Sequence, residues 1–303
     1  MIEFKPLDLA RKTEYDNILL RCGERGCEYS FANLFLWGRQ RAAFLGEQLV
    51  FFSQFNRKTV YLFPVGFGDR KAALDAVMED AKKRGIPCRL TGLLKEDCEA
   101  LEQLYPEKFR FHNDRNSYDY IYNINDLADL SGKKFQRKRN QVNRFLTLYP
   151  DYSIEPITEE TVPQIAEMLH NWYVRRQETD PSGDYHMEKA AIGKALVNFK
   201  ALQLDGIVLR VAGKIVAVTM ASPLSEDTFD IHFEKALDHI VAGYAMINRS
   251  FARYLREKYA AVKWLNREDD LGLEGLRKAK QDYHPHHMVE KSWACLLEDG
   301  YDY

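Results

Sequence analysis

The order of apolar and polar residues predicts an α+β protein in which strands and helices follow one another along the whole chain. In the first half, short β-rich runs are separated by turn residues such as Gly46, which is typical of an antiparallel meander. A helix follows, with Asp69 placed to cap its start and Gly85 placed to end it. The predicted strands are residues 42–45, 49–52, 59–63 and 109–122, and the predicted helix covers residues 69–84.

The second half of the chain repeats this order of elements. A repeat this long favours two copies of one α+β domain over a solenoid of short units. We therefore predict an N-terminal domain of residues 1–150, which ends in a basic helix at 131–149, and a C-terminal domain of residues 151–303. The elements predicted in the second domain are a strand at 152–156, a helix capped by Thr158, a hairpin of 207–211 with 215–221, a strand at 228–233 and a helix at 243–258.

The basic helix carries the densest positive charge of the chain. Phe135, Val142 and Phe145 fall on one helical stripe, and no acidic residue occurs between Lys133 and Arg144. Cations near a helix N-terminus oppose the helix dipole, and an anionic partner offsets that cost. A basic face that is solvated or paired with acids of the other domain is the alternative. The predicted phosphate-binding residues are Lys133, Lys134, Arg137, Arg139, Asn140 and Asn143.

In the strand at 228–233 and just after it, apolar residues alternate with polar ones. Asp230, His232 and Glu234 share one face of this strand. If that face lines a cleft, His232 or Glu234 can act as a general base on an attacking amine or hydroxyl, and we predict Glu234 for this role. A polar stripe that faces solvent is the alternative, because half-exposed strands alternate in the same way.

The stretch from Trp264 to Tyr283 reads as a buried strand that runs through a polar segment into a helix. Ligands in open α/β sheets collect at such strand ends. We predict that Asn266 and Arg267 orient an acyl carbonyl or a phosphate there. An ordinary helix start with acids near its N-terminus is the alternative. The residues predicted to line the same groove are Glu268, Asp270, Gly272, Arg277, Lys280 and Tyr283.

Composition narrows the compartment and the partners. The 303 residues include 43 Lys plus Arg and 45 Asp plus Glu, so a net charge of -2 gives no general attraction to nucleic acid or membrane. The five cysteines contain no C-x-x-C pair, which favours a reduced cytoplasm over a disulfide framework. No apolar run is long enough to span a bilayer. We therefore expect a cytoplasmic protein. We also expect no metal centre, because proline interrupts the histidines of residues 284–287.

Three motifs stand out along the chain. They are Tyr118-Asp-Tyr-Ile-Tyr, Leu130-Ser-Gly-Lys-Lys with Arg139-Asn-Gln-Val-Asn-Arg-Phe, and Asn266-Arg-Glu-Asp-Asp-Leu-Gly-Leu-Glu-Gly-Leu-Arg. Together they resemble the uncharacterised family that is grouped with the C-terminal domain of phosphatidylglycerol lysyltransferases. The resemblance covers nearly the whole chain and implies two tandem GNAT-like (acyl-CoA N-acyltransferase-like) domains, as in Fem-type aminoacyltransferases. Each domain would be a mixed, mostly antiparallel sheet flanked by helices.

The same resemblance implies an activity. The lysyltransferases and Fem-type relatives transfer an aminoacyl group from aminoacyl-tRNA to a lipid or peptide acceptor, in a groove where the two domains meet. We therefore expect an acyltransferase or aminoacyltransferase with no bound cofactor, with aminoacyl-tRNA or acyl-CoA as co-substrate and an amine or hydroxyl acceptor on a lipid, peptide or small molecule. The alternatives are an acyl-CoA-dependent GNAT N-acyltransferase and a non-catalytic module that binds tRNA or another anionic ligand.

The acyl-CoA alternative depends on one loop. GNAT enzymes hold the CoA pyrophosphate with a Gln/Arg-x-x-Gly-x-Gly/Ala segment before a helix. The matching residues here keep Gly243 and Ala245 but place Ile240 where the basic or amide residue stands. The backbone amides of a helix start can still hold an anion. Gly243 and Tyr244 are therefore predicted to contact the donor.

Overall fold

The computed structural model describes residues 1–38, 40–55, 58–181, 183 and 185–297. The chain forms two compact units, each with its own sheet. The first unit comprises Met1–Asp119, Asp269–Arg277 and the chain from Met288 onward. The second comprises Tyr120–Glu268 and Lys278–His287, so the predicted boundary at residue 150 falls inside it.

The sheet of the first unit is mixed and mostly antiparallel. Strands β2, β3 and β4 form the predicted meander, whereas β4 and β6 run parallel. A short strand, β5 (Val65–Gly66), pairs with β3 off the main path. The order across the sheet is β1 (Lys5–Pro6), β2 (Gln40–Leu45), β3 (Gln48–Phe55), β4 (Lys58–Leu62), β6 (Arg89–Leu93), β15 (Ser292–Leu296) and β7 (Phe109–Asn113).

Helices pack on both faces of this sheet, because successive strand residues point to opposite faces. On one face, Val50 joins Leu74 and Leu101 in a single core cluster. On the other face, the ring of Phe51 lies 6.4 Å from that of Tyr15. The helices are α1 (Lys12–Leu19), α2 (Phe31–Trp37), α3 (Arg70–Arg84) and α4 (Lys95–Leu104).

The limits of α3 follow from its capping residues, as the sequence predicts. The carboxylate of Asp69 accepts a hydrogen bond from the amide of Ala72 at 3.0 Å. Gly85 follows the last turn in the left-handed conformation, at φ 67°. A left-handed residue at this position is favourable for glycine, which has no Cβ to clash with the backbone.

The second sheet is also mixed and mostly antiparallel. Strands β10 and β11 form the predicted hairpin, with Ala212 and Gly213 at positive φ in its turn. Strands β12 and β13 run parallel. The order across the sheet is β14 (His287–Val289), β8 (Asp119–Asn123), β13 (Trp264–Asn266), β12 (Thr228–Ala236), β11 (Lys214–Pro223), β10 (Asp205–Val211) and β9 (Ser153–Pro156).

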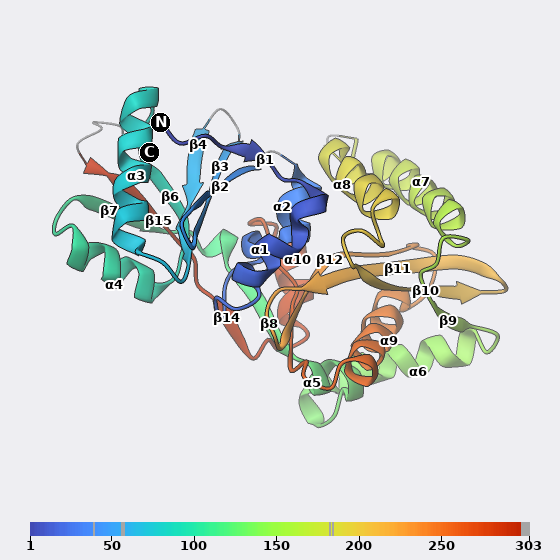
Figure 1. The fold of residues 1–303 in the computed structure, drawn as a ribbon. Helices are drawn as coiled ribbons and strands as arrows, with labels where there is room; N and C mark the ends of the chain where they lie inside the picture. The colour runs from blue at the N-terminus through green and yellow to red at the C-terminus, as the bar shows by residue number, and fades with distance from the viewer. Residues whose placement is uncertain (39, 56–57, 182, 184, 298–303) are drawn as a thin grey trace. The chain divides into compact units, whose positions relative to one another are not determined.

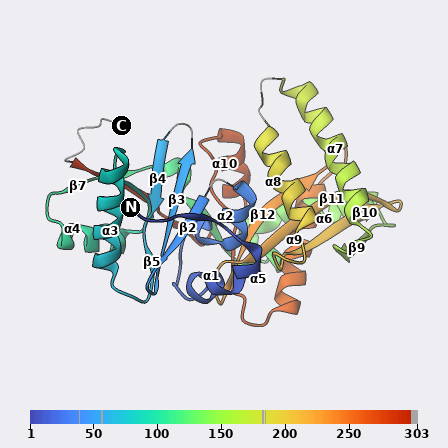
Figure 2. The same ribbon diagram turned by 45° about the horizontal axis from the view of Figure 1, so that its top comes forward.

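The helices of the second unit form two groups. α7 and α8 lie side by side, and α7 and α9 cover opposite faces of the β10–β12 region (Figures 1 and 2). α5 and α6 pack against α9, which buries Ile247, Phe251 and Leu255. The helices are α5 (Ile124–Asp129), α6 (Gln136–Leu148), α7 (Val162–Thr179), α8 (His186–Val197) and α9 (Gly243–Lys258), with α10 (Glu274–Gln281) reaching this unit at Lys278.

Two predicted elements are wrong in detail. The continuous β segment at 109–122 is two strands, β7 and β8, which belong to different sheets and are separated by a turn that Asp114 caps. The helix expected to start at Thr158 begins four residues later, at Val162. Residues 158–161 form a turn instead, in which the Thr161 hydroxyl donates to the carbonyl of Thr158 at 2.9 Å.

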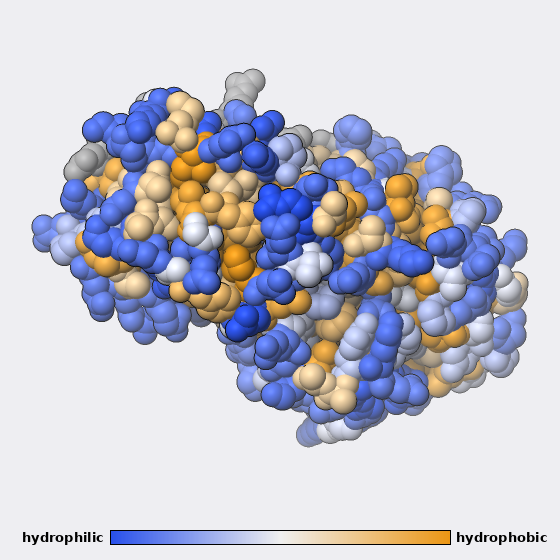
Figure 3. All heavy atoms as spheres, viewed as in Figure 1, coloured by the Kyte–Doolittle hydropathy of each residue, from blue (hydrophilic) through white to orange (hydrophobic). Residues whose placement is uncertain are grey.

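Among the described residues, no helix combines the length and the hydropathy that a bilayer span requires. Hydrophilic residues cover most of the face drawn in Figure 3, with smaller apolar areas between them.

Candidate functional site

Helix α6 is amphipathic in the predicted phase. The side chains of Phe135, Val142 and Phe145 are fully buried. Phe145 packs against the rings of Tyr149 and Tyr152, with centroids 4.9 Å and 5.7 Å away. The apolar stripe therefore fixes which side of the helix is left for polar residues.

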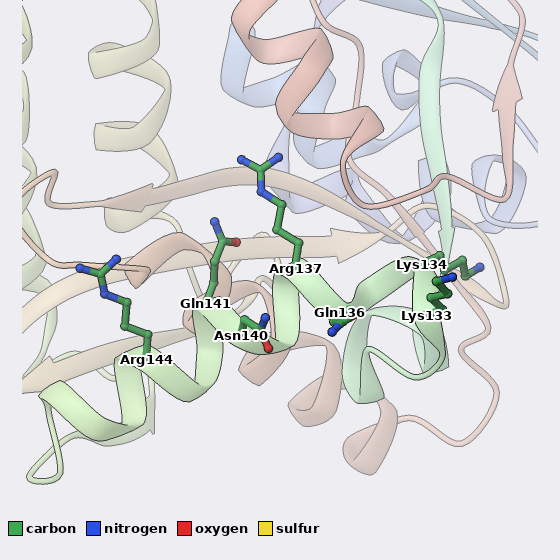
Figure 4. A pocket seen from close by; sticks show the side chains of 7 residues that line it. All are labelled: Lys133, Lys134, Gln136, Arg137, Asn140, Gln141 and Arg144. Carbon is green, nitrogen blue, oxygen red and sulfur yellow. The ribbon is translucent and has the colours of Figure 1, made fainter.

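That polar side forms an open pocket of about 570 Å³. Figure 4 shows its lining side chains along one side of the helix, with Arg137 and Gln141 projecting in the same direction. Two of its cations also have acidic neighbours: Lys134 lies 2.9 Å from Asp126 and Arg137 lies 3.5 Å from Asp282. The lining residues are Lys133, Lys134, Gln136, Arg137, Asn140, Gln141 and Arg144.

Two residues predicted for this face do not line the pocket. The guanidinium of Arg139 donates to the carbonyl oxygens of Leu130 and Gly132, so it holds the turn before the helix. Asn143 is exposed, and its backbone carbonyl accepts the Thr147 hydroxyl at 3.0 Å. The sequence predicted both residues for phosphate binding, but it does not show the local turn that occupies Arg139.

A second group of polar residues is buried around Arg267. This residue directly follows β13, and its Nη2 donates to Oε1 of Glu234 at 2.9 Å. The other oxygen of Glu234 accepts from Nδ2 of Asn248 at 3.0 Å. The guanidinium also lies over the rings of Tyr122 and Tyr283, 5.6 Å and 5.0 Å from their centroids. Such faces attract cations and lower the cost of burying one.

One nitrogen of this guanidinium is left without a partner. Nη1 of Arg267 is buried and makes no hydrogen bond with any part of the chain that the structure describes. A buried donor without an acceptor costs about 1–3 kcal/mol, and more when it is charged. Arginine cannot relieve this cost by losing its proton. The position therefore suits an oxygen atom with negative charge.

Lys138 also belongs to this group of polar residues, and it was not among the site residues predicted from the sequence. Its ammonium lies 3.9 Å from the centroid of the Tyr283 ring and 4.0 Å from a carboxylate oxygen of Asp282. Burial, aided by the positive charge of Arg267, lowers the pKa of Lys138 to about 8. The sequence did contain a signal: Lys138 occupies a position on the apolar stripe, three residues after Phe135 and four before Val142.

The polar face of β12 does not form a solvent-exposed stripe. The side chains of Asp230 and His232 have no exposed surface, and that of Glu234 is 10% exposed. The alternative that these residues face bulk solvent is therefore wrong. Nε2 of His232 lies 2.8 Å from the hydroxyl of Ser222 on β11. The hydroxyl of Ser222 thus gives the buried imidazole a polar partner within the sheet.

The loop that carries Arg267 is held by two buried side chains. Oδ1 of Asn266 accepts the amide of Glu268 at 2.7 Å. The ammonium of Lys280 donates to the carbonyl oxygens of Arg267 and Glu268, the latter at 3.0 Å. Glu268 itself has a φ of 56°. Asn266 and Lys280 thus shape the loop, whereas they were predicted to contact the ligand.

Three other predicted groove residues belong to the first unit. Asp270 is buried and accepts from Nε and Nη2 of Arg277 at 2.9 Å and 3.0 Å. Gly272 has a φ of 73°, and a Cβ there would lie 3.1 Å from Cγ of Asn116. These contacts form an ion-paired turn, and the glycine is explained by this turn without any ligand.

Gly243 and Tyr244, the residues predicted to contact the donor, lie at the start of α9, and Gly243 packs against neighbouring residues of the protein. Gly243 is buried, and a Cβ there would lie 3.3 Å from atoms of both Ala236 and Ile240. Ala242 precedes it at a φ of 60°, and Tyr244 is 40% exposed. The close packing against Ala236 and Ile240 therefore favours a residue without a side chain at this position.

Comparison with known proteins adds a family to this geometry. The family described as "Phosphatidylglycerol lysyltransferase, C-terminal" matches residues 21–295. The chain belongs to this family. No curated protein sequence matches the chain. The resemblance inferred from the three motifs is thereby confirmed.

Solved structures similar to this member of the family agree in fold. A conserved protein of unknown function from Bacteroides thetaiotaomicron is 41% identical, with a TM-score of 0.93 over 98% of this chain and 100% of that one. L-PGS from Bacillus licheniformis is 16% identical, with a TM-score of 0.67 over 96% and 93% of the two chains. FemX is 10% identical, with a TM-score of 0.63 over 99% and 98%. The predicted α+β class and the likeness to tandem GNAT and Fem-type proteins are confirmed.

The burial of Val142 provides a test of the packing of α6. Replacing Val142 with Asp places a charge where no partner exists, so the free energy of unfolding should fall by about 3–5 kcal/mol. Denaturant unfolding followed by circular dichroism measures this change. The matched control is Asn143→Asp on the exposed side, which should stay within about 0.5 kcal/mol of wild type. Equal effects of the two substitutions would contradict the assigned phase.

The environment of Lys138 predicts how stability depends on pH. Its pKa is about 8 in the folded protein and has an ordinary value of 10.5. Between these values the unfolded chain binds more protons than the folded one, so Lys138 makes stability rise with pH. The free energy of unfolding of wild type minus that of Lys138→Met should increase from pH 8 to pH 10.5. Lys133→Met, at an exposed position, corrects for the loss of a lysine. A flat or falling difference would rule out the lowered pKa.

Proposed function

We propose that this protein transfers an aminoacyl or acyl group from a phosphate-rich donor, with aminoacyl-tRNA as the favoured donor, to an amine or hydroxyl acceptor. The observation that carries the proposal is the buried, unpartnered Nη1 of Arg267 beside Lys138, whose pKa is lowered to about 8. Membership of a family named for a lysyltransferase supports the reaction class. The acceptor is proposed only by class: a lipid, a peptide or a small molecule.

Arg267 is proposed to stabilise the negative charge that develops during transfer. When an amine attacks the ester carbonyl of the donor, its oxygen becomes an oxyanion. A fixed donor in a site of low polarity stabilises such an oxyanion strongly and needs no reorganisation. Nη1 of Arg267 is available for this bond, while Nη2 is held by Glu234. Arg267 is therefore the proposed catalytic residue.

Lys138 is the proposed proton acceptor. Transfer forms a bond between the attacking nitrogen or oxygen and the carbonyl carbon, and it breaks the ester bond to the donor, which leaves as a hydroxyl. The attacking group loses one proton and the leaving oxygen gains one. A lysine with a pKa of about 8 can carry this proton near neutral pH. Both oxygens of Glu234 already accept hydrogen bonds, so we now assign it to positioning Arg267 instead of the base role.

The polar face of α6 is proposed to bind the phosphates of the donor. Its pocket offers three exposed cations besides Arg137, together with three side-chain amides. Because the net charge of the whole chain is -2, attraction to a polyanion has to come from such a local surface. A tRNA as partner, the absence of a resident cofactor and a cytoplasmic location are parts of this proposal.

An acyl-CoA-dependent reaction is the second candidate. The observation in its favour is that Gly243 and Ala245 stand at the start of α9, where GNAT enzymes bind the CoA pyrophosphate. The hydrophobic Ile240 and the tight packing around Gly243 disfavour CoA binding at this position and so support the first candidate. A non-catalytic module that binds an anion is separated from both by the experiment below.

Substitution of Arg267 tests the catalytic assignment. Wild type is incubated with a mixture of acceptors and either charged tRNAs or acyl-CoAs, and mass spectrometry identifies the labelled acceptor. Arg267→Lys keeps the charge but loses the planar fork, so turnover should fall at least tenfold, or about 1.4 kcal/mol. Arg256→Lys, at a partly exposed surface pair, is the control.

The same experiment separates the alternatives. Labelling that depends only on acyl-CoA would favour the second candidate. Loss of tRNA binding on charge reversal of Arg137 and Arg144, with no transfer from any donor, would identify a binding module. A variant Arg267→Lys that melts early but transfers normally would show that the residue is only a structural clamp.

The pH dependence of transfer tests Lys138. If Lys138 accepts the proton as a neutral amine, the single-turnover rate should rise with pH and level off above about 8. Lys138→Arg stays charged and should remove both the rise and most of the rate. Glu234→Gln removes a negative charge that raises the pKa of Lys138, so it should lower the rate and shift its midpoint to lower pH. A wild-type rate that falls above pH 8 would instead make Lys138 a cation that binds the donor.

A further inference from the structure

A second buried cluster lies beside the Arg267–Glu234 pair and has no part in the proposed reaction. It contains Asp230 and His232 of β12 and Glu268 of the loop after β13. Nδ1 of His232 lies 3.3 Å from Oδ2 of Asp230 and 3.6 Å from Oε1 of Glu268. One atom from each of the three side chains lies within 4.8 Å of the other two.

The imidazole of His232 is oriented by its other nitrogen. Nε2 lies 2.8 Å from the hydroxyl of Ser222, so the ring can donate its proton there and keep Nδ1 as a lone pair. Nδ1 is buried and makes no hydrogen bond within the described chain, and the side chain has no exposed surface. A lone pair that faces two carboxylates is repelled by them unless a cation lies between. Metal-bound histidines are typically held in this way by a partner on the far nitrogen.

The distances between these atoms fit a tetrahedral metal ion. Zinc lies about 2.0–2.2 Å from nitrogen and carboxylate ligands, which places two tetrahedral ligand atoms about 3.4 Å apart. The two separations from Nδ1, 3.3 Å and 3.6 Å, lie on either side of this value. The side chain of Glu268 is 20% exposed, so an ion can enter from its side.

We propose that Asp230, His232 and Glu268 form a binding site for a divalent transition-metal ion, with Zn²⁺ as the expected occupant. One imidazole and two carboxylates suit zinc, and Mn²⁺ accepts the same set less tightly. This departs from the expectation of no metal centre and is independent of the proposed transferase activity. Because His232 and Glu268 stand two and one residues from Glu234 and Arg267, the ion would fix the backbone that carries that pair.

A comparable cluster in the first unit does not carry the same proposal. Cys27, Glu28 and Asp119 also have their ligand atoms within 4.8 Å of one another. There, however, the ammonium of Lys291 lies 2.7 Å from Asp119 and 2.9 Å from Glu28. A lysine already supplies the positive charge that a metal ion would bring.

The binding experiment has to exclude surface histidines. Nδ1 of the exposed His286 lies 2.9 Å from Nδ1 of His287, and such a pair can bind zinc weakly. The full chain with His286→Ala is therefore the reference protein. After loading with Zn²⁺ alone and dialysis against metal-free buffer, it should retain one zinc per chain by elemental analysis, and calorimetry should give a single site.

Variants of the cluster decide whether this is the zinc site. In the reference protein, His232→Gln and Glu268→Gln should each weaken zinc binding at least tenfold. Ser222→Ala, which removes the partner of the far nitrogen, should weaken it by about 10- to 100-fold. The matched controls His239→Gln and Glu274→Gln, at exposed positions, should leave it unchanged. Absence of zinc uptake by the reference protein, or uptake that His232→Gln and Glu268→Gln leave unchanged, would overturn the proposal.

A bound proton is the competing explanation, and nitrogen NMR of His232 distinguishes it. With a metal site, addition of Zn²⁺ should shift the Nδ1 resonance and leave Nε2 protonated. A doubly protonated ring that does not respond to Zn²⁺ would overturn the proposal in favour of a buried ion pair. Since Glu268 is partly exposed, Glu268→Gln remains informative even if His232→Gln fails to fold.

Discussion

Next to β13, the guanidinium of Arg267 is buried. Its neighbours compensate only part of the cost of burying this charge, and the arrangement of the region depends on that pairing. Glu234 neutralises Arg267, and two tyrosine rings lie against its faces. The side-chain nitrogen of Lys138 also lies close to the ring of Tyr283. Replacing such groups with apolar residues often increases stability, so their retention in an interior has a cost. A site that is short of negative charge suits the anionic donor proposed above, at the expense of stability.

The supporting structure around this site is rigid for a simple reason. Arg267 follows a strand that lies between two others, and the adjoining loop is tied down by Asn266 and Lys280. Each of these buried side chains satisfies backbone groups that would otherwise lack partners. A guanidinium on such a loop can be positioned without a conformational change, which is what electrostatic stabilisation of a reacting group requires.

Local pattern was sufficient for much of this fold. The helix expected at residues 243–258 has those bounds, and the apolar stripe of α6 fixed its phase through Phe135, Val142 and Phe145. Pattern could not assign a strand to a sheet, and so residues 109–122 were read as one element. It also did not select Lys138, which lies on the apolar stripe of the same helix. The hydrogen bond that Arg267 donates to Glu234 joins residues 33 positions apart in the sequence, and only the tertiary structure reveals it.

The position of β15 has a consequence for how the chain folds during synthesis. This strand, Ser292–Leu296, lies between β6 and β7, whose residues are made about 200 and about 180 positions earlier. Until β15 has left the ribosome, β6 and β7 each present an open edge, and open edges are prone to pair with other chains. Closing the sheet requires contacts between residues far apart in sequence, which form slowly. The nascent first unit therefore needs protection from aggregation until β15 has been synthesised.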